Sequence, residues 1–199
     1  KTDDGWVDIG AVVRLAPIKD VKTMIYAFFE LHERLPKVRL HIMGGVDDEE
    51  YGAECHALVE TLGVRDLIFT GRVNVVEYME KLDFTILTSI SEGQPLSVLE
   101  SLAARRPCVT TEVGCCRELL EGAPGDDFGV AGFVTPPMYR KGLADAMERM
   151  CTSRARRIEM GERGQRRVAT YFLHEQMLAN YRALYDETAR AFNLPREGE

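Results

Sequence analysis

Short apolar runs alternate with amphipathic stretches along the first 135 residues, and this alternation limits the fold more than any other feature of the chain. The amphipathic stretches carry apolar residues at helical spacing, as at Met24, Phe28 and Leu31. Strands that alternate with helices form right-handed β-α-β units and a parallel sheet. We therefore predict an α/β fold, a Rossmann-like doubly wound parallel sheet of about six strands flanked by helices. The predicted strands cover 8–15, 38–43, 67–70, 84–88, 108–111 and 130–134, and the predicted helices cover 19–35, 49–62, 75–82 and a segment that starts at Pro95.

The length of 199 residues fits one domain, 1–199, in which 142–193 is mostly helical and 194–199 is a frayed tail. The net charge of −7 argues against a general nucleic-acid binder, which is usually basic. Local basic clusters at 154–157 and 163–167 are predicted to form a solvated helix face. No apolar run approaches the roughly 18 residues of a membrane span.

Cysteines and histidines give no pattern of a metal site. The five cysteines include the adjacent pair Cys115 and Cys116, which we place in a loop and expect to be reduced thiols. The chain has no Cys-x-x-Cys or Cys/His zinc spacing, and its four histidines form no cluster in the sequence. The cysteines and histidines therefore indicate no metal site.

Residues 84–104 carry the most functional information. A buried strand at 84–88 leads through a glycine turn into a helix, with Pro95 in the first turn. The free backbone N–H groups of 93–97 at this helix start would attract a phosphate. Glu92 lies before the turn and Glu100 lies in the helix, so both carboxylates can border one ligand. This arrangement suits a ligand with hydroxyls at both ends and a diphosphate between them, which describes a nucleotide sugar.

The Glu-x7-Glu pattern within 91–100 resembles the donor-site signature of retaining GT-B glycosyltransferases of the glycogen-synthase and sucrose-synthase type, family GT4. A second match lies at 14–23, and its segment 17–23 is similar to the PelF-like branch, which serves Pel exopolysaccharide synthesis. The resemblance covers the C-terminal, donor-binding half of such an enzyme, and the start at Lys1 rather than Met favours an excised half. It implies a cytoplasmic, retaining hexosyltransferase that uses UDP-glucose as its donor and needs no metal and no cofactor.

The resemblance also assigns roles to individual residues. Glu92 would contact the sugar, Glu100 the ribose hydroxyls, and the cations Arg14 and Lys19 would stabilise the departing diphosphate. Where relatives have glycine before the clamp arginine, this chain has Val13. The catalytic residues are thus Glu92, Arg14 and Lys19, and the substrate-binding residues are Glu100, Gly93, Gln94, Leu96, Ser97, Gly71, Arg72, Val73 and Gly44.

The resemblance implies a UDP-sugar donor and a missing N-terminal acceptor domain, without which the chain would bind donor but transfer no sugar. Peripheral association with a membrane polysaccharide-export complex is a further expectation. Several alternatives stay open. Arg14 and Lys19 could instead form surface salt bridges, for instance with Asp20. The chain could also be half of a GT-B-fold UDP-sugar epimerase, or a non-catalytic interaction module with a relict pocket.

Overall fold

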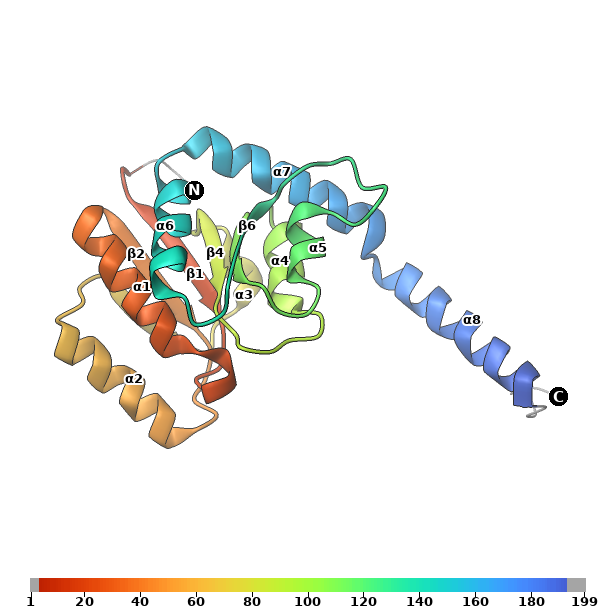
Figure 1. The fold of residues 1–199 in the computed structure, drawn as a ribbon, viewed down its shortest axis with the longest axis horizontal. Coiled ribbons are helices and arrows are strands. Elements are labelled where there is room, and N and C mark those ends of the chain that lie inside the picture. The colour runs from red at the N-terminus through yellow and green to blue at the C-terminus, as the bar shows by residue number, and fades with distance from the viewer. Residues whose placement is uncertain (1–3, 193–199) are drawn as a thin grey trace.

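The computed structural model describes residues 4–192 and contains a six-stranded parallel sheet. Its strand order is β3-β2-β1-β4-β5-β6 (Figure 1). The chain first adds β2 and β3 on one side of β1 and then adds β4, β5 and β6 on the other side, so the order of strand addition reverses between β1 and β4. In such sheets the crevice at this reversal, beyond the carboxyl ends of the strands, is where ligands bind. The predicted fold class is confirmed. The strands are β1 (Val7–Val12), β2 (Val38–Met43), β3 (Leu67–Gly71), β4 (Phe84–Leu87), β5 (Cys108–Thr111) and β6 (Gly132–Thr135).

Helices cover both faces of the sheet. One face carries α1, α2 and α6, and the other carries α3, α4 and α5, with α7 packed across α4 and α5 (Figure 1). The helices are α1 (Val21–Arg34), α2 (Glu49–Leu62), α3 (Val75–Met79), α4 (Leu96–Ala103), α5 (Cys116–Glu121), α6 (Arg140–Cys151), α7 (Arg154–Tyr171) and α8 (His174–Phe192), preceded by the 3₁₀ turn η1 (Pro17–Lys19).

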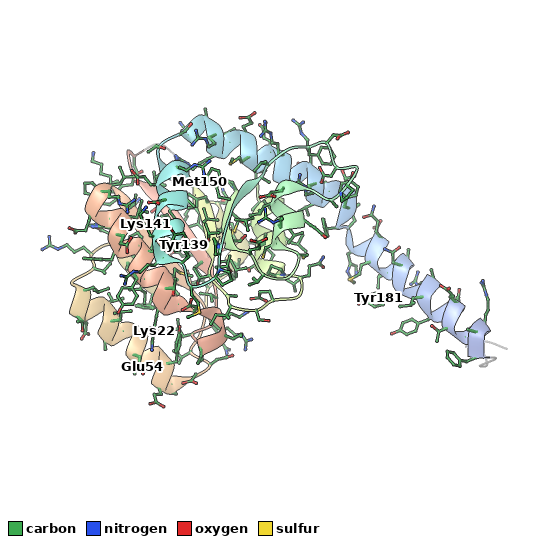
Figure 2. The ribbon with its side chains drawn as sticks, in the orientation of Figure 1. Lys22, Glu54, Tyr139, Lys141, Met150 and Tyr181 are labelled. Atoms are coloured by element: carbon green, nitrogen blue, oxygen red, sulfur yellow. The ribbon has the colours of Figure 1, made fainter. Side chains whose placement is uncertain are left out.

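The largest core cluster lies between the sheet and the face formed by α1, α2 and α6. The predicted apolar face of α1 is fully buried there, with Met24, Phe28 and Leu31 at 0% exposure. Across the outer side of this layer, Lys22 of α1 pairs with Glu54 of α2 at 2.5 Å (Figure 2). The central strands are buried on both sides, as expected for a parallel sheet covered by helices.

Several local features differ from the sequence prediction. The helix predicted at 75–82 ends at Met79, and the strand predicted at 130–134 covers Gly132–Thr135. The first strand ends at Val12 instead of Leu15, because the chain turns into η1 and Leu15 forms an isolated bridge with Val46. Pro95 is the N-cap of α4, one position before the predicted first turn. Cys116 lies in α5 and not in a loop, and its side chain packs with the buried Leu119 and Leu120.

The basic clusters of α7 are only partly solvated, which corrects that prediction. Arg157 is 8% exposed and donates to the carbonyls of Met150 and Cys151. Arg167 is 1% exposed and pairs with Asp126 at 2.5 Å. A buried cation needs hydrogen-bond acceptors or an anion as partners. Both guanidinium groups find these partners on neighbouring segments, and the contacts hold α7 against those segments.

Helix α8 projects from the rest of the domain and has no buried residue (Figure 1). Tyr181, halfway along it, is 53% exposed and lies beyond the edge of the sheet layers (Figure 2). Among residues 4–192, no helix has the length and apolar character needed to cross a membrane. The tail predicted to fray, 194–199, lies outside the described residues.

Candidate functional site

The loops that follow β1, β2, β3 and β4 surround a cavity of about 590 Å³ at the carboxyl edge of the sheet. We name it the switch-point cavity, since it lies at the reversal of strand order. Its volume is within the usual range of ligand pockets, about 300–1,000 Å³. Its lining residues are Val12, Val13, Arg14, Lys19, Met43, Gly44, Gly45, Arg72, Val73, Val75, Glu92, Pro95, Leu96, Ser97 and Glu100.

Lys19 and Glu92 form an ion pair inside this cavity. The distance from Lys19 Nζ to Glu92 Oε1 is 2.5 Å, and the two side chains are only 20% and 15% exposed. The backbone holds their two loops together, because the N–H of Ile90 donates to the carbonyl of Ile18 at 2.9 Å. Thr88 Oγ1 donates to the carbonyl of Lys19, also at 2.9 Å. The pair is therefore fixed by the packing of two loops that are distant in the sequence.

Arg14 forms a second, more exposed ion pair at the rim. Its guanidinium contacts the carboxylate of Asp47, and the side chains are 64% and 38% exposed. The N–H groups of Asp47 and Asp48 both donate to the carbonyl of Leu15 at 3.1 Å, so the loop after β2 is fastened to the loop after β1. The alternative of a surface salt bridge is thus correct in kind, with Asp47 as the partner of Arg14 in place of Asp20.

Gly44 allows the ends of β1 and β2 to approach closely. A Cβ atom there would lie 2.0 Å from the carbonyl oxygen of Val13, so no other residue fits without a backbone shift. The Val13 side chain is 7% exposed and belongs to the main core cluster. Beside it, the Arg72 side chain lies against Gly45, where an added Cβ would be 3.1 Å from Arg72 Nε. Val13 therefore packs mainly into the core, while Arg72 crosses the β2 edge of the cavity.

The loop before α4 rests on the turn after β5. Gly114 has a φ of +51°, and a Cβ atom there would lie 2.1 Å from the carbonyl oxygen of Gly93 and 2.5 Å from that of Glu92. The N–H of Cys115 donates to the carbonyl of Gly93 at 3.0 Å. Only glycine combines this positive φ with such close backbone contact. Gly114 consequently sets the height of the Glu92 loop above the sheet.

The structure brings most of the predicted site residues together. Glu92 and Lys19 are paired in the cavity, Arg14 lies at its rim, and Glu100 reaches it from the exposed side of α4. The other predicted residues that line it are Gly44, Arg72, Val73, Leu96 and Ser97, whereas Gly71 and Gly93 do not, and Gln94 lines a separate groove beside α8.

Sequence reasoning missed several residues of the site, among them Gly45 in the cavity wall. Val12, Met43 and Val75 line the apolar part of the cavity, and Asp47 holds Arg14. The apolar residues gave no signal because they read as ordinary strand and helix residues. Asp47 directly precedes Asp48, the N-cap of α2, and nothing in the local sequence distinguishes it from an ordinary loop carboxylate.

The histidines and cysteines lie outside this cavity. His41 contacts Asp8 and Tyr78 at 3.0 Å each in a buried polar cluster. All five cysteines are free thiols. Burial raises the pKa of Cys116 to about 11 and that of Cys108 to about 12, which keeps both protonated at neutral pH. Among the described residues no group of three His, Cys, Asp or Glu side chains is placed to hold a metal ion.

Comparison with known proteins identifies the family. Residues 7–153 match the family model described as glycosyl transferases group 1. The chain belongs to this family. This glycosyltransferase domain is 26% identical over 175 residues to N-acetyl-alpha-D-glucosaminyl L-malate synthase of Bacillus anthracis, an alignment that covers 87% of the chain and 43% of that enzyme. The chain spans less than half the length of the curated relatives that it matches.

Solved structures share the fold of the domain. Sucrose-phosphate synthase from Thermosynechococcus elongatus superposes with a TM-score of 0.79 at 22% identity, over 94% of this chain and 46% of that one. Anabaena Alr3699/HepE in complex with UDP and glucose gives a TM-score of 0.77 at 22% identity, over 89% of this chain and 48% of that one. The domain therefore has the architecture of about half of each of these two larger chains.

Proposed function

We propose that this domain binds the nucleotide-sugar donor of a glycosyltransferase, with UDP-glucose as the donor. The observation that carries the proposal is the gathering of Arg14, Lys19, Glu92 and Glu100 around one cavity at the switch point of the sheet. Two cations suit a diphosphate, and two carboxylates suit the hydroxyl groups on either side of it. The Anabaena protein of similar fold, solved with UDP-glucose, supports the class of donor.

The lining of the cavity suggests how such a donor would lie. Arg72 and Val73, at the end of β3, would receive the nucleobase, and Glu100 would accept hydrogen bonds from the ribose hydroxyls. The diphosphate would lie between Arg14, Lys19 and the start of α4, where the N–H groups of Leu96 and Ser97 have no intrahelical partner. The hexose would then lie beside Glu92.

In this proposal Arg14 and Lys19 stabilise the negative charge that develops on the departing UDP. Fixed cations in a cleft do this better than bulk water, and removal of one such group typically costs about 3 kcal/mol of barrier. The acceptor would come from a further domain, so we expect this chain alone to bind donor without transferring sugar.

Several narrower assignments belong to the same proposal. The first two are retention of the anomeric configuration and independence of metal ions. The other two are a role in exopolysaccharide synthesis of the PelF-like kind and peripheral association with a membrane export complex. The similarity of residues 17–23 to the PelF-like branch supports the role in exopolysaccharide synthesis and the association with the export complex.

Thermal unfolding in the presence of nucleotides tests the proposal. The purified chain is heated with UDP, GDP, ADP or UDP-glucose, each with EDTA. A ligand at a hundred times its Kd stabilises the fold by about 2.7 kcal/mol, which corresponds to roughly 5–10 °C for a domain of this size. We expect a shift with the two uridine nucleotides and little with the others.

Two variants connect such a shift to the switch-point cavity. Glu100→Gln should weaken UDP binding about tenfold, because it removes a charged acceptor for the ribose. Glu60→Gln is the matched control, since Glu60 is an exposed helix glutamate of α2 outside the cavity. Absence of a shift with every nucleotide, or equal effects of the two variants, would refute the proposed function.

A further inference from the structure

The ion pair between Lys19 and Glu92 occupies the place where the proposed function puts a diphosphate and a sugar. Both side chains are mostly buried, and the 2.5 Å contact leaves Lys19 Nζ engaged with a carboxylate before any ligand arrives. A diphosphate that binds through Lys19 must therefore compete with Glu92 for this cation, and the competition costs free energy because it weakens the ion pair. This cost falls on every ligand that binds through Lys19.

The consequence for Glu92 depends on what the diphosphate carries. Phosphate oxygens of free UDP only accept hydrogen bonds at neutral pH, so they offer nothing to the carboxylate. Glu92 would remain partly buried without its cation and close to another anion, which is unfavourable. A hexose attached to the diphosphate carries hydroxyl donors that can replace Lys19 as the partner of Glu92.

We propose that Glu92 acts as an internal counter-ion of Lys19 that makes the cavity prefer a sugar-bearing nucleotide over the free nucleoside diphosphate. The inference rests on the proposed function and adds a specificity role to it. When the sugar has been transferred, Glu92 recovers Lys19 and the remaining UDP loses a cation. The same ion pair would thus weaken binding of the product.

The second ion pair of the site provides an internal comparison. Asp47 neutralises Arg14 at the rim, but its side chain is more exposed and does not line the cavity. Exposed pairs are worth little, and Asp47 has no contact with the region assigned to the hexose. Removing its charge should therefore change the affinities for UDP and UDP-glucose by the same small factor.

Calorimetric titration of UDP and UDP-glucose into the wild-type chain, Glu92→Gln and Asp47→Asn tests the inference. In Glu92→Gln we expect UDP to bind about tenfold more tightly, because the neutral amide releases Lys19 at less cost. UDP-glucose should gain much less, since the same change weakens the acceptor for its hydroxyls. The ratio of the Kd for UDP to the Kd for UDP-glucose should therefore fall about tenfold in Glu92→Gln and stay unchanged in Asp47→Asn.

The outcomes separate the inference from the proposed function. An unchanged ratio in Glu92→Gln, or an equal loss of affinity for both nucleotides, would refute the counter-ion role while leaving donor binding intact. Failure of the wild-type chain to bind either nucleotide would refute the proposed function and the inference with it. Urea unfolding checks that each variant is folded, and Glu92→Ser replaces Glu92→Gln if the latter does not fold, with the same shift in the ratio expected.

Discussion

Replacing Gly114 by alanine should displace the loop that carries Glu92. The new Cβ atom would lie 2.1 Å from the carbonyl oxygen of Gly93, and real Cβ contacts are essentially never under 3.0 Å. The backbone must therefore move by about 0.9 Å, the difference between these two distances. The neighbouring atom is main chain, so no side-chain rotation can relieve the clash.

Two costs add in Gly114→Ala. A left-handed φ costs an L-residue about 1–2 kcal/mol, and overpacking against a rigid neighbour costs about 1–3 kcal/mol more. Gly63→Ala is the matched control, because Gly63 has a φ of +62° and a Cβ atom there meets nothing within 4 Å. We expect urea unfolding to show a loss of about 2–5 kcal/mol for Gly114→Ala and about 1–2 kcal/mol for Gly63→Ala.

The binding assay separates the loop from general stability. A shift of about 0.9 Å in the Glu92 loop should weaken UDP binding roughly tenfold in Gly114→Ala, because the helix-start amides and Lys19 no longer face one diphosphate. UDP binding to Gly63→Ala should match that of the wild type. Equal stability losses in the two variants, or unchanged UDP affinity in Gly114→Ala, would refute the reasoning.

Three further predictions concern the rest of the domain. Asp126→Asn should cost about 3–5 kcal/mol in urea unfolding, because it removes the only carboxylate that the described residues pair with the 1%-exposed Arg167 and leaves its charge with carbonyl acceptors alone. The hydrogen bond from Arg167 lowers the pKa of Asp126, so the ion pair stabilises the fold above the unfolded pKa of about 3.9 and loses this effect as pH falls through the folded pKa. The stabilities of the variant and the wild type should therefore converge as the pH falls below 4. A difference that does not depend on pH would contradict this. Deletion of α8 should change the melting temperature by less than about 4 °C, since the helix has no buried residue, and a larger fall would show that it supports the fold. At pH 8 a thiol reagent should modify Cys115 slowly and leave Cys108 and Cys116 unmodified until the protein unfolds. The reason is that burial raises the pKa of all three thiols. Fast reaction of Cys108 in the native protein would contradict the structure.

The fold could be predicted because it depends on local periodicity. The strand at 38–43 and the helix at 49–62 were predicted to the residue, and Gly63 ends that helix with a left-handed φ. The six-residue helix α5 was missed because it is too short to show a helical period. The buried Arg157 and Arg167 were predicted to be solvated, since their partners Asp83 and Asp126 lie 74 and 41 positions away in the sequence.

The candidate site was predicted as a set of residues but not as a set of pairs. A motif indicates which residues gather around a ligand, and the structure places most of them in one cavity. It does not indicate which charges neutralise each other when no ligand is present. Lys19 and Glu92 are 73 positions apart, and Arg14 and Asp47 are 33 apart. Such pairs follow from how the loops pack, which no local pattern contains.

Main-chain hydrogen bonds, more than side chains, connect the loops around the cavity. The N–H of Ile90 binds the carbonyl of Ile18, Leu15 binds Gly45, Gly44 binds Gly71, and Cys115 binds Gly93, all at 2.9–3.0 Å. These four bonds join the end of β3 and the loops after β1, β2, β4 and β5 into one frame. Under the proposed function, a side chain such as Arg72 could therefore vary without moving the cations, and such a frame would let the base change while the proposed diphosphate site stays in place.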